Sequence, residues 1–240
     1  MSDESREKFR AKYRAAISPY YSGWIHMITL CVTAGCLMWW ALAQLNGFVW
    51  TDLWIVPAAF LASNIGEYAG HRWFGHQKTK LMKLFYQRHT GDHHTFFEEH
   101  AMAFQMVLDW RVVIFPIYLI VLFTVLVAIP GGLILTWLFN VNVGLLFGTV
   151  TISQYFLYEL LHFSYHVPRG TRTERVFLAI PGWKYLRLFH TVHHNRDLMH
   201  DANFNVTFPI TDWLVGTLKF SSGDERAPDQ GWVKPATLAE

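Results

Sequence analysis

The chain has 240 residues, of which 52% are hydrophobic, 17% aromatic and only 16% charged. Soluble domains carry nearer 25% charged residues, so this composition indicates a membrane protein. The formal net charge of +2 is too small to predict the basic surface of a nucleic-acid-binding protein, and we expect no nucleic-acid partner. Cys31 and Cys36 lie in an apolar run, which predicts packing rather than a disulfide or a thiolate metal site.

Apolar stretches at residues 24–45 and 53–70 predict a first transmembrane hairpin. The polar, mixed-charge segment before them lacks the pattern of a cleavable signal peptide, so we expect the first stretch to stay as an anchor. Residues 24–45 contain no charge and are long enough to cross a bilayer. The second stretch is shorter and contains Pro57 and Glu67, and we expect its last turns to leave the membrane.

Residues 112–129 and 133–161 are again apolar and predict a second hairpin. The "PGG" at 130–132 predicts the turn between them. The last run exceeds one crossing, so we expect its end to project into water. The sequence therefore predicts one all-α domain over residues 1–240. It is an integral-membrane protein with four transmembrane helices in two hairpins and a helical cap formed by the polar regions 71–100 and 162–220.

Arginine and lysine are distributed unevenly over this topology. They precede the first span, lie between the second and third spans and follow the fourth, whereas the loops at 46–52 and 130–132 contain none. By the positive-inside rule, both termini and the cap face the cytoplasm. We expect a multi-pass protein of the bacterial inner membrane, with the endoplasmic reticulum membrane as the alternative.

Ten of the thirteen histidines form four clusters in the two polar regions. The clusters read HRWFGH, HTGDHH, HFSYH and HTVHH. A neutral imidazole binds a metal through one ring nitrogen, and side chains three or four residues apart share a face of a helix. The clusters therefore predict a metal centre, whose candidate ligands are His71, His76, His89, His93, His94, His162, His166, His190, His193 and His194.

The spacings predict which of these side chains share a face. The pairs four apart are His89 with His93 and His162 with His166, and the pair three apart is His190 with His193. The first cluster has a spacing of five, from position 71 to position 76, so we expect a distorted or interrupted turn there, which Gly75 permits. Directly adjacent histidines point in different directions, so they predict two neighbouring metal ions or two sides of one site. Ten imidazoles are too many for one octahedral ion, so we expect two ions with about five imidazoles each.

Three histidines lie outside the clusters. We expect His26 and His100 to be surface or satisfied core residues, and we expect His200 not to be a ligand. The alternative for the clusters is a histidine-rich surface tract with incidental metal affinity, but such tracts are usually disordered. Histidine suits zinc, copper, iron and nickel, so the residues alone leave the metal open.

The order HxxxxH, HxxxHH, HxxxH and HxxHH within paired apolar hairpins resembles the fatty acid hydroxylase/sterol desaturase superfamily of integral-membrane di-iron enzymes. The resemblance extends over roughly residues 60–217. Acyl-CoA desaturases have similar boxes, but typically three of them. Asn205 stands where the family usually has a glycine. The C-terminal part of the pattern is matched by Asn203, Phe204, Asp212, Gly216 and Thr217.

The resemblance implies two iron ions held by the ten clustered histidines, with O2 as a co-substrate. Two electrons reduce O2 at such a centre, and the oxidised centre then takes a hydrogen atom from an unactivated aliphatic C–H bond of a membrane lipid. Hydroxylation gives an alcohol and desaturation gives an alkene. We expect a lipid hydroxylase, with a lipid or sterol desaturase as the alternative, and no catalytic residue beyond the metal ligands. Zinc can replace iron in a purified sample.

The sequence contains no cytochrome b5-like heme motif, iron–sulfur cysteine set or flavin fingerprint. We therefore expect a separate electron donor, such as a cytochrome b5-like protein, a ferredoxin or a reductase. Docking of an acidic carrier would explain the basic loops, and the topology rule explains them equally well. Second ring nitrogens of metal-ligating histidines usually donate to an acceptor. The candidate acceptors near the clusters are Glu67, Asp92, Glu159, Asp197, Asp201 and Asn203.

Two other classes of protein remain as alternatives. A membrane transporter or sensor for metal would place its ligands near the middle of the bilayer. The clustered histidines instead lie outside the apolar runs. A membrane zinc protease would require an HExxH helix, and the sequence has no such motif.

Overall fold

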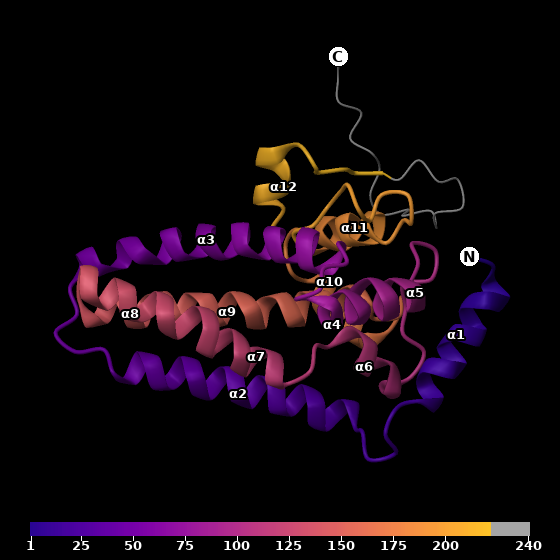
Figure 1. The fold of residues 1–240 in the computed structure, drawn as a ribbon, viewed down its shortest axis with the longest axis horizontal. Helices are drawn as coiled ribbons and strands as arrows, with labels where there is room; N and C mark the ends of the chain where they lie inside the picture. Colours follow the sequence, from indigo (N-terminus) through magenta and orange to yellow (C-terminus); the bar gives the residue numbers. More distant parts are fainter. Residues whose placement is uncertain (222–240) are drawn as a thin grey trace.

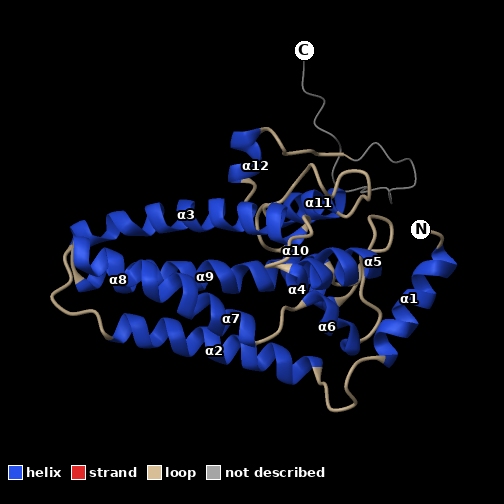
Figure 2. Cartoon of the chain, in the orientation of Figure 1, coloured by secondary structure: helices blue, strands red, loops and turns tan. Residues whose placement is uncertain are grey.

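The computed structural model describes residues 1–221, and these residues form helices and no strands (Figure 2). Three segments are π-helical and two are 3₁₀-helical: η2 (Gly70–Gly75), η3 (Gln87–His93) and η5 (Thr124–Ala128), then η1 (Trp50–Trp54) and η4 (Val107–Asp109). The α-helices are α1 (Asp3–Ala15), α2 (Gly23–Ala43), α3 (Ile55–Ala69), α4 (Lys83–Tyr86), α5 (His94–Phe96), α6 (Trp110–Val113), α7 (Tyr118–Phe123), α8 (Ile129–Leu138), α9 (Val141–Tyr165), α10 (Arg172–Leu178), α11 (Trp183–His193) and α12 (Ile210–Val215).

Four long helical rods bring the histidine-bearing segments to one end of the molecule (Figure 1). The rods are α2, α3, the continuous α7–η5–α8 and α9, and α9 contacts the other three. The shorter helices α4, α5, α6, α10 and α11 gather at the right-hand end of the rods in Figure 1. The largest apolar core lies near this end and includes Leu30, Ile114, Ile120 and Phe163. The expected all-helical fold is therefore confirmed for the described residues.

Two helical stretches within the described part of the chain are long and apolar enough to cross a membrane. They are Gly23–Ala43, with a mean hydropathy of 1.7, and Val107–Leu138, with a mean hydropathy of 3.0. A continuous exposed apolar surface is unusual for a soluble monomer and favours contact with lipid. Large apolar side chains point outward from the rods, among them Ile25, Val32, Trp39, Leu61, Leu126 and Trp137.

The prediction of a turn at residues 130–132 is wrong. The helix that begins at Tyr118 continues through Pro130 to Leu138, and the chain reverses at Phe139 and Asn140 instead. Pro130 lacks a backbone N–H and cannot complete an ordinary α-helical turn. The π-turn η5 directly precedes it and absorbs this defect, as wider turns commonly do in long helices. The third rod consequently runs over residues 118–138, not 112–129, and the fourth begins at 141.

The glycines of this segment serve helix packing rather than a turn. A Cβ added to Gly132 would lie 3.0 Å from the carbonyl oxygen of Gly144, and one added to Gly144 would lie 2.4 Å from that of Gly132. The backbones of α8 and α9 therefore touch at a point where only glycine fits. Close approach through small residues is a common way for helices to associate within a membrane.

Substitution of Gly144 by alanine is expected to destabilise the protein by about 1–3 kcal/mol, since the new methyl group overlaps backbone atoms that cannot rotate away. Gly148→Ala is the matched control, because the nearest atom to its added Cβ is 4.0 Å away. Unfolding by denaturant in mixed micelles measures both variants. Equal stabilities of the two variants would show that the helices do not approach as described.

Candidate metal centre

The ten clustered histidines converge into two buried groups of five. Within each group, the candidate ligand nitrogens all lie within 4.8 Å of one another. Group 1 consists of His71, His76, His89, His94 and His193. Group 2 consists of His93, His162, His166, His190 and His194.

In group 1, π-helical turns bring together histidines that are five residues apart. His71 lies in η2 and His76 follows it, while His89 lies in η3 and His94 follows it. A π-helix is hydrogen-bonded between residues five apart, so these pairs share a face. The distortion expected in the first cluster is therefore a π-turn. Gly75 leaves room for it, because a Cβ there would lie 3.0 Å from the ring of His89.

In group 2, ordinary α-helical turns supply two pairs that are four residues apart. His162 and His166 lie at the end of α9, and His190 and His194 lie at the end of α11. Each group takes its fifth histidine from a segment that also serves the other group. Group 2 receives His93 from η3, and group 1 receives a residue of α11. Directly adjacent histidines thus belong to different groups. Of the two alternatives predicted for adjacent histidines, this arrangement favours two neighbouring sites over two sides of one site.

Two of the pairs expected to share a face are divided between the groups. His89 and His93 are separated because η3 is a π-helix, in which the residue five positions on takes the shared face. His190 and His193 are separated because His194, one residue further along α11, occupies the same side as His190. Spacings of three and of four both fit one face of a helix, so the sequence could not decide between these partners.

The spacing of the nitrogens fits coordination of one ion per group. Neighbouring Nε2 atoms are 2.7–3.2 Å apart in group 1 and 3.0–3.1 Å apart in group 2. Two nitrogens that each lie about 2.1 Å from a shared ion, at right angles, are about 3.0 Å apart. The fold therefore brings the nitrogens of each group to the spacing that one ion would require.

Backbone carbonyls fix where the imidazole protons lie. Nδ1 of His93 donates to the carbonyl oxygen of Val112 at 3.1 Å, and Nδ1 of His194 donates to that of Phe97 at 3.0 Å. Because a carbonyl only accepts, both Nδ1 atoms carry the proton and both Nε2 atoms present lone pairs. These two Nε2 atoms nevertheless lie 3.1 Å apart. Two facing lone pairs repel each other, and a cation beside both removes the repulsion.

Burial keeps these side chains in the form that binds metal. Removal from water, reinforced by neighbouring imidazoles, lowers the pKa of the nine clustered histidines outside the rods, and the pKa of His71 is lowered to about 4. At neutral pH the imidazoles are therefore uncharged, and each offers a lone pair to a cation.

The metal-free protein is expected to lose stability as the pH falls below about 6.5. The unfolded chain binds protons on these histidines there, whereas the folded chain does not. Each such histidine therefore lowers the free energy of unfolding by about 1.4 kcal/mol for each unit by which the pH falls, until the pH reaches the pKa of that histidine in the folded protein. The melting temperature of chelator-treated protein at pH 7.5 and 5.5 measures this. An equal or higher value at pH 5.5 would refute the burial of neutral imidazoles.

The segment after α11 orients two histidines of group 1 through its backbone. Nδ1 of His71 donates to the carbonyl oxygen of Phe204, and Nδ1 of His193 donates to that of Ala202 at 2.8 Å. Asn203, between these two carbonyls, has a φ of 58°, a conformation that asparagine tolerates better than most residues. Its side chain bonds the backbone of Phe189 and Lys219 and so fixes this bend.

Asp212 holds the same segment from the other side. Its carboxylate accepts hydrogen bonds from the backbone N–H groups of Phe204 and Asn205 and from the hydroxyl of Thr217. Asn205 itself donates to the carbonyl oxygen of Asn64 in α3. Its φ is not positive, so the backbone does not require the glycine that is usual at this position. The C-terminal stretch of the sequence pattern is therefore a support for group 1.

The side-chain acceptors expected from the sequence do not orient the histidines. Glu67 accepts from Val206 and Thr207, Glu159 accepts from Phe115 and Tyr155, and Asp92 pairs with Gln87 and Arg88. Asn203 bonds backbone groups, and no hydrogen bond joins Asp197 or Asp201 to a clustered histidine in the described part of the chain. Backbone carbonyls take this role for five of the ten, and sequence carries no signal for which carbonyls these will be.

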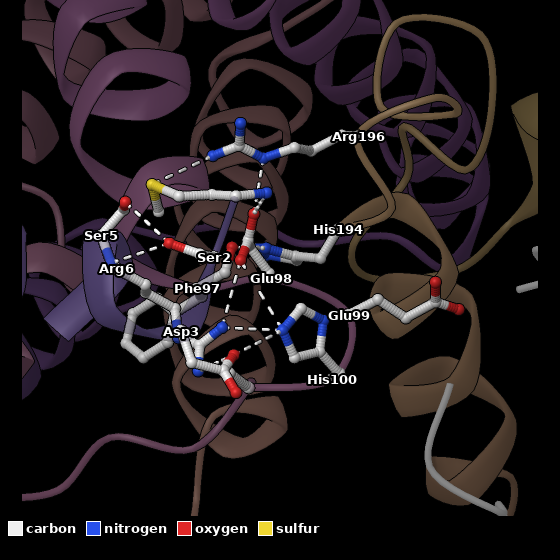
Figure 3. Close-up of polar contacts among 12 residues, drawn as sticks. Ser2, Asp3, Ser5, Arg6, Phe97, Glu98, Glu99, His100, His194 and Arg196 are labelled. Carbon is white, nitrogen blue, oxygen red and sulfur yellow. Dashed lines mark hydrogen bonds and ion pairs between the residues drawn. The ribbon is translucent and has the colours of Figure 1, made fainter. Parts of the chain in front are cut away.

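A charged network ties the N-terminal helix to group 2 (Figure 3). The buried carboxylate of Glu98 lies 3.2 Å from Arg6 of α1 and 2.5 Å from Arg196, which follows α11. Glu98 directly follows Phe97, whose carbonyl holds His194 and whose ring centroid is 4.2 Å from that of His166. This network was missed in the sequence, because its members are some 90 residues apart along the chain.

The three remaining histidines lie outside both groups. His26 is a satisfied core residue, as expected, since Nε2 bonds the carbonyl of Phe115 and Nδ1 bonds Tyr21. His100 pairs with Arg6 and Asp3. His200 is exposed, although its ring centroid is 5.3 Å from that of His76.

A small cavity lies against both groups. Its volume is about 10 Å³, and it is lined by His89 of group 1, by His93 and His162 of group 2, by Arg88 and by residues 112–115. A space of this size holds about one water molecule. A small molecule in this cavity would contact histidines of both groups.

The family model described as "Fatty acid hydroxylase" matches residues 56–217, which is more than half of the chain. The matched region contains all ten clustered histidines and the supporting segment that ends at Thr217. No curated protein and no solved structure gives a match.

Proposed function

Because the chain belongs to the fatty acid hydroxylase family, we propose that it is an O2-dependent di-iron enzyme that hydroxylates an aliphatic C–H bond of a membrane lipid. The observation that carries this proposal is the pair of buried five-histidine groups with converging Nε2 atoms. A structural zinc site closes with four ligands, so two adjacent sets of five neutral imidazoles favour redox-active metal with a free position on each ion.

We assign the ten clustered histidines as the ligands of the two ions. When bound, the irons would supply the activation of O2 and the attack on the C–H bond. The protein chain would hold the two ions and shield them. The backbone carbonyls of residues 97, 102, 112, 202 and 204 accept the Nδ1 protons of five of these histidines, which leaves their Nε2 atoms free of protons. Phe97 covers group 2 from the side of α1.

The lipid is proposed to approach along the rods. In this proposal α2, α3, α7–η5–α8 and α9 are four transmembrane spans in two hairpins, and the metal centre lies just beyond their cytoplasmic ends. The positive-inside rule supports this orientation. The exposed apolar surface of the rods supports their contact with lipid.

Electrons are proposed to come from a separate donor at the cytoplasmic face. A cavity of about 410 Å³ lies at the proposed cytoplasmic face, and its charged lining residues are Arg10, Arg169, Arg187 and Glu99. Met102, whose carbonyl accepts from Nδ1 of His166, and Thr191, next to His190, also line it. The cavity therefore reaches residues directly behind group 2. Three arginines against one glutamate in this lining would favour an acidic carrier, such as a ferredoxin or a cytochrome b5-like protein.

Two other functions are weighed against this one. A desaturase would use the same groups and differ only in how the substrate carbon lies beside them. A metal transporter would need ligands along a path across the bilayer. The two groups instead sit at one end of the rods, which disfavours transport.

Oxygen-isotope labelling separates these possibilities. Cells that express the chain are grown under ¹⁸O2, and their lipids are compared by mass spectrometry with those of cells that express the His162→Ala variant. Hydroxylation predicts lipids that carry one ¹⁸O atom and depend on His162. New double bonds without ¹⁸O would identify a desaturase. Identical lipids in both strains would contradict an oxygenase of membrane lipids.

A further inference from the structure

Phe115 lies at the junction between the apolar rods and the metal centre. It belongs to the short break between α6 and α7, and its side chain is 9% exposed. It also lines the cavity of about 10 Å³ that touches His89, His93 and His162. This space holds about one water molecule and is too small for a segment of an alkyl chain. A lipid can reach both groups through it only if a wall of the cavity moves.

Phe115 contributes its ring to that wall, and two further aromatic rings stack on it. The ring of Phe115 stacks on Phe85, with centroids 5.1 Å apart, and on Tyr158, with centroids 6.0 Å apart. Phe85 lies 6.4 Å from the ring of His89 in group 1, and Tyr158 lies 5.6 Å from that of His162 in group 2. The three rings thus connect a histidine of one group to a histidine of the other, with Phe115 in the middle.

The backbone of Phe115 is fixed by two buried side chains from separate rods. Its N–H donates to Oε2 of Glu159 in α9 at 3.2 Å, and its carbonyl oxygen accepts from Nε2 of His26 in α2 at 3.0 Å. Tyr155 donates to the other oxygen of Glu159, and Tyr21 bonds Nδ1 of His26. Burial of a carboxylate and an imidazole is costly unless they are hydrogen-bonded. Both anchors hold the main chain, so the ring is the part of the wall that is left to rotate.

We propose that the ring of Phe115 is the gate between the membrane and the metal centre, and that its size sets how far an alkyl chain enters. Glu159 and His26 act as positioning residues that keep the gate over the cavity. This inference rests on the proposed function, because it needs metal in both groups and an alkyl substrate.

Metal-binding probes with alkyl tails test the gate without turnover. The protein is loaded with cobalt(II) in mild detergent, and the dissociation constants of 1-methylimidazole and 1-butylimidazole are read from the visible spectrum. In the wild-type protein the butyl tail is expected to give no gain. In Phe115→Ala the tail enters the vacated space, and each buried methylene tightens binding about fourfold, so the butyl probe gains at least tenfold. Partition of the probes into micelles is common to all variants and cancels between them.

Phe123→Ala is the matched control. Phe123 lies in α7, packs on Tyr155 of α9 and does not line the cavity. It should behave as the wild-type protein does. Phe115→Leu should give an intermediate gain, and it replaces the alanine variant in the comparison if that variant does not retain cobalt. Equal probe ratios in the wild-type and Phe115 variants, with cobalt present in all, would overturn the gate alone. A wild-type protein that holds no cobalt would overturn the proposed function and the gate together.

Discussion

Replacement of His193 or His162 by alanine is expected to remove one metal ion and abolish turnover. The first variant removes a proposed ligand of group 1 and the second a proposed ligand of group 2, and both side chains are fully buried among the other histidines. Loss of a residue that merely orients a ligand already costs about 10–100-fold in metal affinity or activity. Loss of a ligand should therefore reduce turnover by at least about 100-fold. Mass spectrometry of metal content and the lipid product assay measure the two effects.

His100→Ala is the control for these variants. His100 is exposed and lies close to His93 and His94 in sequence, but it pairs with Arg6 and Asp3 and belongs to neither group. Its metal content and turnover should match those of the wild-type protein. Near-normal turnover in either cluster variant would contradict the assignment of the ten histidines as ligands.

Asp212→Ala is expected to weaken group 1 while group 2 keeps its metal. The substitution leaves the buried N–H groups of Phe204 and Asn205 without an acceptor, which costs about 3 kcal/mol of stability. It also frees the segment whose carbonyls hold His71 and His193. Because loss of such outer support typically costs 10–100-fold in metal affinity, metal titration should show one weakened site beside one unchanged site.

Asp52→Ala provides the matched comparison. Asp52 is also a buried carboxylate that accepts a backbone N–H, from Val49, and a side-chain N–H, from Asn140. It lies in η1, before the start of α3, whereas the histidines follow the end of that helix. The Asp52 variant should lose stability but bind both metals normally. If both aspartate variants bind metal alike, Asp212 does not support group 1.

The sequence predicts the components of the centre well, because they depend on local composition. Long uncharged runs predict helices, and clusters of histidine predict metal ligation whatever the exact turn geometry. The ten residues named from their spacing are those that the structure gathers. The structure divides the ten histidines into two groups of five, while the two ions themselves stay a prediction. The resemblance to the hydroxylase family is confirmed by the match over residues 56–217.

Which histidines belong to the same group could not be predicted, because this depends on backbone hydrogen bonds that side-chain type does not determine. The π-turns η2 and η3 change the shared face from a spacing of four to a spacing of five. The third rod passes through Pro130 and two glycines, which in most sequences mark a turn. For five of the ten histidines the acceptor for Nδ1 is a backbone carbonyl, and every residue has one. Tertiary packing alone selects Phe97, Val112 and Phe204 among them.

The central claim is that each chain holds two iron ions, one in each group of five histidines. The most direct test is the metal content per chain, measured by mass spectrometry on protein purified in mild detergent from cells supplied with iron. The account predicts two iron ions per chain in the wild-type protein, and the loss of metal from the His162→Ala and His193→Ala variants. One metal ion or none in a well-folded wild-type sample would contradict it.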